Sequence, residues 1–272
     1  EASDIKAESD ITINTEDSLD IQTDSLYTEN GSVSITAGED LTTGSISAPN
    51  GSVKLEAGGS ITSEGITAQD GIEASAGEKL TLKDVAAGSV KINSGSDAEI
   101  FVKENAVITG IDEQSKVDGD LLITGSGKES AVIDDLEING DLTAGTKDGS
   151  LKTVTVNKTA PDGKLNIFAE ESAAADIDGD LTLGTVTAKS AVIKVNNGTM
   201  INGLDDEEKD KGNINASAIV LEASGNNSGI GGQLDPVSVR ITRNEGYSEE
   251  PDASADGDIF IEILNTPEDE VS

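Results

Sequence analysis

The stretch "NGSVSITAGEDLTTGSISAPNGSVKLEAGGSITSEGITAQDG", residues 30–71, states one pattern twice and begins it a third time. Asn30-Gly31 opens the first unit, Asn50-Gly51 the second and Asp70-Gly71 the third. The period is therefore about 20 residues. A fixed period of this length is typical of a solenoid or another repeat architecture.

Within each unit, apolar and polar residues alternate. Val33, Ile35 and Ala37 are separated by polar residues, and the positions 20 residues later are again apolar. Alternation with a period of two indicates a β-strand with one buried face. Two more apolar positions follow in every unit, at Leu41 and Ile46 in the first. We therefore predict about three short strands per unit, separated by turns.

Such short strands can pair with the equivalent strands of the next unit. Stacking at the strand spacing of ~4.8 Å places Val33 over Val53 and Leu41 over Ile61. The sequence thus predicts an all-β fold, a parallel β-helix (β-solenoid) of about 12 coils of ~20 residues. Narrow aliphatic layers also explain why only 2% of the chain is aromatic. Asn-Gly and Asp-Gly tolerate positive φ at a corner.

The pattern loosens along the chain but persists, which predicts one solenoid over residues 1–272. Residues 10–26 fit one more coil at the start, with Ile11, Ile13 and Leu19 facing inward. Residues 202–211 and 244–255 are acidic and lack periodicity, so we expect both to protrude as loops. The chain begins in strand-like alternation, with neither an initiator Met nor a signal peptide. We interpret it as a segment of a longer protein.

Charge and composition exclude several classes of function. The net charge of −35 argues against nucleic acid and against an anionic membrane surface, since both attract basic patches. The chain has no Cys, so it forms no disulfide or thiolate site. No apolar run approaches the ~20 residues of a membrane span. Low hydrophobicity with high charge is also typical of disorder, but the repeat argues against that interpretation.

Catalysis is poorly supported, because the absence of His and Cys removes the commonest bases and nucleophiles. Carboxylate pairs can still divide the roles of acid and base. The candidates for a β-helix polysaccharide lyase or hydrolase are Asp134-Asp135, Asp205-Asp206, Arg240 and Arg243. Acidic pairs beside turn signals are more simply solvated corners, so we expect no enzyme.

Calcium is the cation that this sequence could hold. Ca²⁺ takes six to eight oxygen ligands, and stacked carboxylates at the corners could supply them. Three Asp-Gly-Asp corners provide the candidate ligands, which are Asp118, Asp120, Asp178, Asp180, Asp256 and Asp258. The competing interpretation is a corner Asp whose carboxylate accepts a backbone N–H. A calcium-loaded carbohydrate-binding module is accordingly an alternative function.

Two passages carry a family resemblance. "GSVKLEAGGSITSEGITA" (51–68) is similar to the repeats of filamentous haemagglutinin-like proteins, and "GNINASAIVLEASGNNSGIGG" (212–232), followed by "DPVSVRI" and "DGDIFIEI", resembles a recurrent passage of such giant bacterial surface proteins. The resemblance implies a secreted right-handed β-helix at the cell surface that acts as an adhesin, stalk, filament or surface-layer element. The implied partners are a host or neighbouring cell surface, carbohydrate, or further copies assembled through the solenoid ends.

Overall fold

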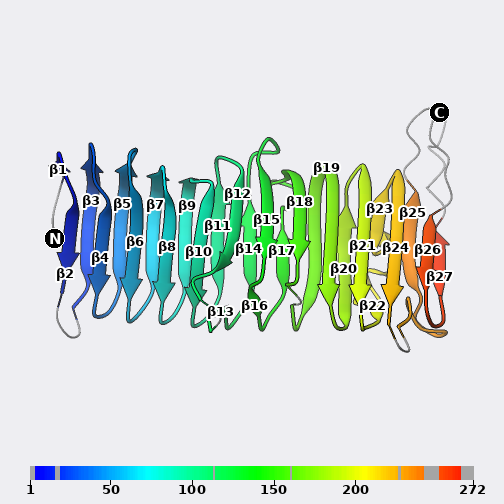
Figure 1. Ribbon diagram of the computed structural model, residues 1–272. Helices are drawn as coiled ribbons and strands as arrows, with labels where there is room; N and C mark the ends of the chain where they lie inside the picture. The colour runs from blue at the N-terminus through cyan, green and yellow to red at the C-terminus, as the bar shows by residue number, and fades with distance from the viewer. Residues whose placement is uncertain are drawn as a thin grey trace.

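The computed structural model describes residues 4–15, 19–112, 114–159, 161–225, 228–241 and 251–264. These residues form 27 β-strands and one short 3-10 helix, stacked as a β-solenoid of about 12 turns. Figure 1 shows the first strands at one end of the rod and the last at the other. The predicted fold class is confirmed.

Two parallel ladders run along the rod. Ladder one consists of β1 (Ile5–Ala7), β3 (Ile21–Thr28), β5 (Leu41–Ala48), β7 (Ile61–Ala68), β9 (Leu80–Ala86), β11 (Ala98–Val102), β14 (Leu121–Thr124), β17 (Leu142–Ala144), the first half of β19 (Lys164–Asp178), β20 (Leu181–Thr187), β22 (Met200–Asn202), β23 (Ile214–Ala216), β25 (Val237–Ile241) and β27 (Ile261–Leu264). Ladder two consists of β2 (Ile11–Asn14), β4 (Val33–Ala37), β6 (Ser52–Ala57), β8 (Gly71–Ala76), β10 (Ser89–Ser94), β12 (Ala106–Gly110), β13 (Lys116–Val117), β15 (Ser130–Asp134), β16 (Glu137–Ile138), β18 (Leu151–Asn157), the second half of β19, β21 (Ser190–Asn196), β24 (Ala218–Ser224) and β26 (Asp252–Ala255).

The register agrees with the 20-residue period. Val33 pairs with Val53 between β4 and β6, and Leu41 pairs with Ile61 between β5 and β7. Every coil therefore bonds to the coils before and after it. The backbone N–H and C=O groups of the strands are satisfied between coils.

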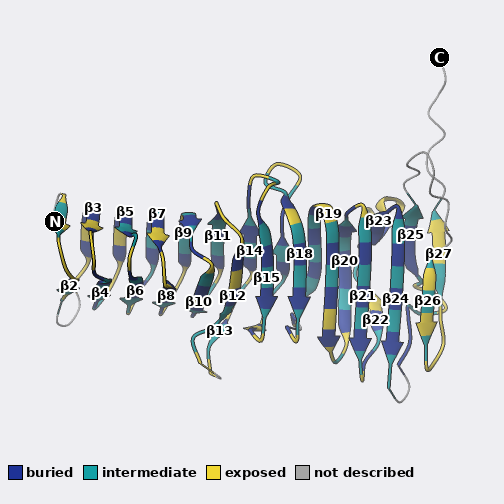
Figure 2. Cartoon of the chain, turned by 45° about the horizontal axis from the view of Figure 1, so that its top comes forward, coloured by how far each residue is buried: buried dark blue, intermediate teal, exposed yellow. Residues whose placement is uncertain are grey.

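The core is a continuous aliphatic column. Its members are almost all Ile, Val, Leu and Ala, and most are fully buried (Figure 2). The phenylalanines Phe101, Phe168 and Phe260 are only partly buried and lie outside this column. Tyr27 is 39% exposed, which places the ring at the surface. Among the residues that the structure describes, aromatic rings are therefore excluded from the stacked layers, as the composition indicated.

Each early coil has two strands, not the three that the sequence pattern predicted. β5 runs through both apolar positions, Leu41 and Ile46, as one bent strand. Its burial pattern changes phase at Gly44-Ser45, where two consecutive residues turn away from the core. The backbone of the strand keeps pairing on both sides of this bend. A turn residue inside a strand can thus bend the strand without ending it.

The corner glycines are needed mainly because the backbones of successive coils approach closely there. Of the three opening glycines, only Gly71 has φ in the left-handed region, at 120°. A Cβ on Gly51 would overlap the carbonyl oxygen of Gly31 in the coil before. A second glycine column behaves in the same way, with each member lying against the carbonyl of the previous one: Gly38, Gly58, Gly77 and Gly95.

The bounds of the two predicted loops need correction. Within 202–211, Asn202 ends β22 and residues 209–211 form the 3-10 helix η1 (Lys209–Lys211). Within 244–255, residues 252–255 form β26, which pairs in parallel with β24, while residues 244–250 lie outside the described residues. The acidic composition of this segment led to the prediction of a loop where the structure has the short strand β26. Leu19 is also not inward but 58% exposed, because the buried face of that coil begins at Ile21.

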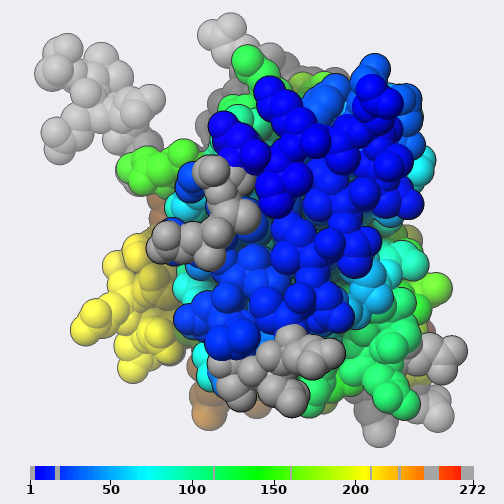
Figure 3. All heavy atoms as spheres, turned by 90° about the vertical axis from the view of Figure 1, so that its left-hand side faces the viewer, coloured from blue at the N-terminus to red at the C-terminus, as the bar shows by residue number. Residues whose placement is uncertain are grey.

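The insertion after β22 leaves a coil and returns to the same coil. β20 pairs with β22 through Leu183 and Asn202, and with β23 through Val186 and Ile214. Figure 3 shows this segment (yellow) projecting beyond the outline of the first coils. The fully buried Asn213 closes the gap, since its Nδ2 donates to the carbonyl of Leu183 at 2.7 Å.

Replacing Gly77 with alanine should destabilise the rod by about 1–3 kcal/mol, because the new methyl group overlaps the carbonyl of Gly58. The matched control is Gly88→Ala. A Cβ at Gly88 meets no atom within 4 Å, so that variant should be unchanged or up to about 1 kcal/mol more stable. Urea denaturation followed by circular dichroism measures both. Equal losses in the two variants would contradict the role given to the glycine column.

Candidate functional site

The first surface feature is a short loop that separates two strands of ladder two, β12 and β13, which both pair with β10. β10 pairs with β12 at Val90 and Ile108, a spacing of 18 residues (108 − 90), and with β13 at Ser94 and Val117, a spacing of 23 (117 − 94). The five extra residues are 111–115, and the ones that the structure describes are 111, 112, 114 and 115. The loop rises from the flank of the rod and forms one wall of a groove.

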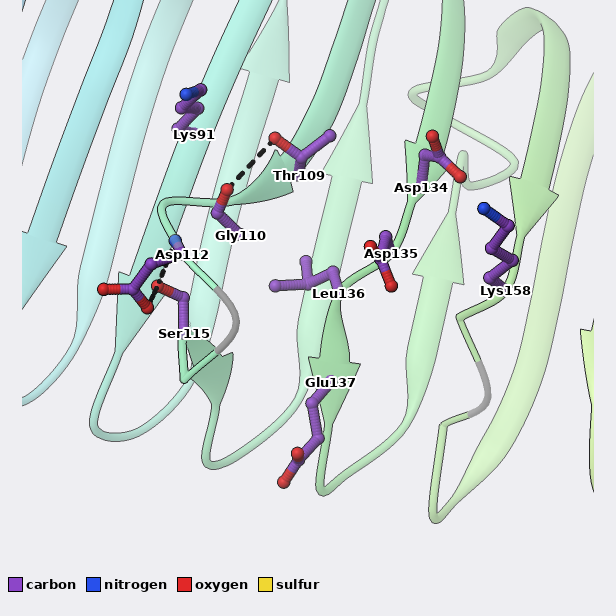
Figure 4. Close-up of a pocket in the computed structure, with 10 residues that line it drawn as sticks. All are labelled: Lys91, Thr109, Gly110, Asp112, Ser115, Asp134, Asp135, Leu136, Glu137 and Lys158. Carbon is purple, nitrogen blue, oxygen red and sulfur yellow. Dashed lines mark hydrogen bonds between the residues drawn. The ribbon is translucent and has the colours of Figure 1, made fainter.

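This groove, called the acidic groove below, has a volume of about 630 Å³ and crosses the coils that follow the loop. Its lining residues are Lys91, Thr109, Gly110, Asp112, Ser115, Asp134, Asp135, Leu136, Glu137 and Lys158. Figure 4 shows Asp112 and Ser115 on one side of the groove, with Asp134, Asp135 and Lys158 on the other. Four carboxylates and two amines therefore face one depression.

Hydrogen bonds among Asp112, Gln114 and Ser115 fix the conformation of the loop. Ser115 Oγ donates to Asp112 Oδ1 at 2.8 Å, and the N–H of Gln114 donates to the same oxygen at 3.0 Å. These bonds, the one from Ser115 first, lower the pKa of Asp112 below its usual value. Directly after these residues, the N–H of Lys116 donates to Asn93 Oδ1 at 3.1 Å. The loop is thus fixed internally and is tied to the previous coil at its C-terminal end.

The structure brings the predicted pair Asp134-Asp135 together with lysines. Asp134 ends β15 on the outer face, and Asp135 adopts φ 51° at the bend that follows. Lys158 has the same φ, 51°, one coil further on. Carboxylates beside amines can bind polar or charged ligands and exchange protons. That the chain is no enzyme stays a prediction.

The other predicted catalytic residues serve the insertion after β22. Lys164 Nζ lies 3.2 Å from Asp205 Oδ2, which ties the insertion to an earlier coil. Arg240 donates to the carbonyl oxygen of Asp210. Asp206 also lies in this insertion, whereas Arg243 lies outside the described residues. These groups do not meet Asp134 in the acidic groove.

The Asp-Gly-Asp corners are largely occupied by bonds within the protein. Asp120 Oδ1 accepts the N–H of Asp141 at 2.8 Å, and Asp180 Oδ1 accepts the N–H of Thr199 at 2.8 Å. Asp256 Oδ2 accepts the N–H of Gly225, also at 2.8 Å. The competing interpretation, an Asp that accepts a backbone N–H, therefore describes these three.

The remaining three corner aspartates differ. Asp118 Oδ1 accepts from Asn139 Nδ2 at 2.8 Å and pairs with Lys116 Nζ at 2.6 Å. Asp178 and Asp258 are exposed at their corners, and their carboxylates have no hydrogen bond to a described residue. Across the described ranges, no group of three or more acidic side chains is placed to hold a metal ion. Calcium binding stays a prediction.

Asp120 and Asp180 belong to a longer column at the start of the ladder-one strands. Asp97 accepts the N–H of Asp120 at 3.0 Å, and Asp141 accepts the N–H of Lys164 at 2.6 Å. Earlier in the rod, Asp40 accepts the N–H of Ser60 at 2.8 Å. Each carboxylate thus binds the coil that follows. The column is a structural seam along the rod.

A second groove lies at another corner, beside two stacked loops. The loops cover residues 125–129 and 145–150 and rise above the rod between successive strands (Figure 2). They bond to each other, since the N–H of Gly127 donates to the carbonyl of Ser150 at 2.7 Å. In the next coil, β19 passes the same corner without a loop. The step from two loops to none creates the groove.

Glu129 organises the first of these loops. Glu129 is 8% exposed, and its carboxylate accepts the N–H of Ser126 at 2.7 Å and the hydroxyl of Ser126 at 2.8 Å. Burial opposes ionisation of Glu129, but the bonds from Ser126 and from the N–H groups of Lys128 and Glu129 outweigh it, so the pKa of Glu129 lies below its usual value. The carboxylate therefore stays charged inside the loop.

The second groove, called the aromatic groove below, has a volume of about 390 Å³. Its lining residues are Thr146, Lys147, Ser150, Phe168, Ala169, Glu170, Thr187, Ala188, Lys189 and Ser217. One carboxylate and two amines face this groove, in a chain with 53 acidic and 18 basic residues. The aromatic groove is thus locally basic on a strongly acidic rod.

Sequence reasoning missed both grooves. Neither the loop 111–115 nor Lys91, Lys158 or Phe168 stood out as a motif. The available signal was coil length, because a local spacing of 23 residues instead of 18 marks an inserted loop. An outward position for Phe168, between inward Ile167 and Ala169, was a second signal. A groove itself depends on neighbouring coils with unequal loops, which no single repeat reveals.

Comparison with known proteins gives no relative for this chain: no family model, no curated protein and no solved structure matches it. Among the described residues, no helix is long and apolar enough to cross a membrane. Functional inference therefore depends on the fold and the grooves themselves.

The Asp column predicts a difference between two aspartates of Asp-Gly-Asp corners. Asp120→Ala should lose about 1–3 kcal/mol of unfolding free energy, because the N–H of Asp141 loses its acceptor. Asp178→Ala is the control and should change stability by less than about 0.5 kcal/mol. Chemical denaturation of both variants tests the difference. A larger loss at Asp178 would show that the carboxylate bonds do not stabilise the corner.

The lowered pKa of Glu129 predicts a pH-dependent contribution to stability. Glu129→Gln should destabilise the protein by about 1 kcal/mol at pH 7, because neutral acceptors bind N–H groups less strongly. The difference from wild type should persist above the usual glutamate pKa of about 4.3 and disappear as the pH falls through the lower folded-state value. Thermal melts from pH 7 to pH 3 measure it, with exposed Glu104→Gln as control. A difference that grows on acidification would refute the assignment.

Proposed function

We propose that this chain is a structural and adhesive β-solenoid that acts outside the cell, as part of a rigid stalk, filament or surface layer. One observation carries the proposal: two parallel ladders run without a break from β1 to β27 and from β2 to β26, around one aliphatic core. Each coil is bonded along its length to its neighbours. The resulting body is a rod of roughly 60 Å, given about 12 turns and a rise of ~4.8 Å per turn.

Stiffness follows from this arrangement. Bending the rod requires separating hydrogen-bonded coils on one side and compressing packed side chains on the other. Interiors packed at crystal-like density resist such compression. A rod of this kind can hold a contact surface at a fixed distance from its attachment point.

The charged surface supports an exterior role. Ion pairs connect neighbouring coils, as between Lys83 Nζ and Glu64 Oε1 at 2.8 Å and between Lys194 Nζ and Glu222 Oε2 at 2.8 Å. Such exposed pairs stabilise by less than about 1 kcal/mol each. The remaining negative charge repels other rods and keeps them from bundling. We therefore expect partners to bind at the loops and grooves, which interrupt the negatively charged surface of the rod.

The proposed location can be tested on the cells that make the protein. Antibodies against the purified chain should label intact cells as strongly as permeabilised ones, because the rod is exposed at the surface. Mild protease treatment of intact cells should remove this labelling. An antibody against a cytoplasmic protein serves as the control and should label only permeabilised cells.

The adhesive role needs a separate measurement. Cells lacking the gene should attach less well to their natural surface, and re-expression of the wild-type chain should restore attachment. Labelling restricted to permeabilised cells would overturn the extracellular assignment. If cells that lack the gene attach as well as wild-type cells, the adhesive role is wrong, and only a structural role remains.

A further inference from the structure

We propose that the aromatic groove binds an acidic saccharide, a sugar ring that carries a carboxylate. The assignment rests on the surface role proposed above and gives it a class of partner. A volume of about 390 Å³ lies within the range of small-ligand sites and suits one or two sugar rings. Three features support this assignment: an outward aromatic ring, two amines without ion pairs, and coils that offer no edge for a peptide.

Phe168 supplies an apolar face. It pairs with Thr187 between β19 and β20, and it points outward while Ile167 and Ala169 point to the core. Ala169 and Ala188, each 8% exposed, also line the groove. Only 2% of this chain is aromatic, so an outward ring inside a groove stands apart from the rest of the surface. The C–H face of a sugar ring packs on such a ring, leaving its hydroxyls at the rim.

Lys147 and Lys189 supply positive charge. Both lysines are exposed, and neither forms an ion pair with any residue that the structure describes. The lone carboxylate, Glu170, is already bound, since Ser150 Oγ donates to its Oε1 at 2.7 Å. The two amines therefore remain available to a ligand carboxylate, with which they form charge-assisted hydrogen bonds.

The charge of the whole chain does not cancel this local preference. At physiological ionic strength, exposed charges farther apart than ~8 Å are largely screened. Among the residues that line the groove, the charged ones are Lys147, Lys189 and Glu170, and their charges sum to +1. The hydroxyls of Thr146 and Thr187 add neutral hydrogen-bonding groups at the rim. Such groups suit the ring hydroxyls of a saccharide.

An extended peptide suits the groove less well. Peptides commonly bind by adding a strand to an open sheet edge. Here β19 is bonded to both β17 and β20, and β20 is bonded to β19 and β23, so this part of ladder one has no open edge. A sugar ring can be bound by protein side chains alone, so its binding does not require an open sheet edge.

Calorimetric titration of the folded chain tests the site. The acidic probes are trigalacturonate, a hyaluronan tetrasaccharide and sialyllactose, while methyl-esterified trigalacturonide and lactose are the neutral probes. At least one acidic probe should bind at least tenfold more tightly than both neutral ones. Phe168→Ala should weaken that probe about tenfold, and the double variant Lys147→Gln/Lys189→Gln should reduce it to the affinity of the neutral probes.

Two matched controls come from the same chain. Phe101 occupies the same outward column of ladder one and also pairs with a threonine, Thr124, but it does not line the groove. Phe101→Ala and Lys91→Gln should therefore leave binding unchanged. Circular dichroism confirms that each variant is folded. Succinate, a carboxylate without a sugar ring, should compete at least tenfold less well than the acidic probe.

Several outcomes would overturn the assignment. These are no binding by any acidic probe, equal binding of neutral probes, equal competition by succinate, or equal losses in the Phe168 and Phe101 variants. None of them bears on surface labelling of intact cells, so failure of the saccharide site and failure of the surface role are separate results.

Discussion

The stacking of each coil on the next is the constraint on which this structure depends. A residue in one coil lies over its counterpart about 20 residues later, so every column must hold side chains that tolerate being repeated at the strand spacing. Aliphatic side chains meet that condition inside the rod. Glycine meets it at the corners, where Gly77 lies against the carbonyl of Gly58. The low aromatic content and the recurrent glycines have this one cause.

The same constraint explains how so acidic a chain folds. Among the described residues, carboxylates on the outer face and at the corners accept backbone N–H groups or pair with lysines of a neighbouring coil, as Asp40 and Glu64 do. Asp120 bridges two coils in this way, because its carboxylate accepts from Asp141 while its own N–H donates to Asp97. Negative charge at the corners is thus part of the bonding between coils. The two grooves occur where neighbouring coils carry loops of different lengths.

Sequence reasoning recovered what repeats and missed what does not. Val33 over Val53 followed from the period, since inward positions and backbone pairing both repeat. The merging of two expected strands into β5 did not, because a glycine in a bent strand and a glycine in a turn look alike in one sequence. β26 was hidden by its acidic composition. The aromatic groove depends on loops in two coils and none in the third, a relation between coils that local patterns do not contain.

The interrupted coil at β22 and β23 has a consequence for how such rods diversify. Between the paired positions, β20 has two residues, 184 and 185, whereas the next coil has eleven, 203–213, and yet the pairing resumes in step. The length of the inserted segment therefore does not affect the register of strand pairing in the ladder. New segments can be spliced at this point without shifting any later layer. Such a scaffold can change what it displays while its shaft stays the same.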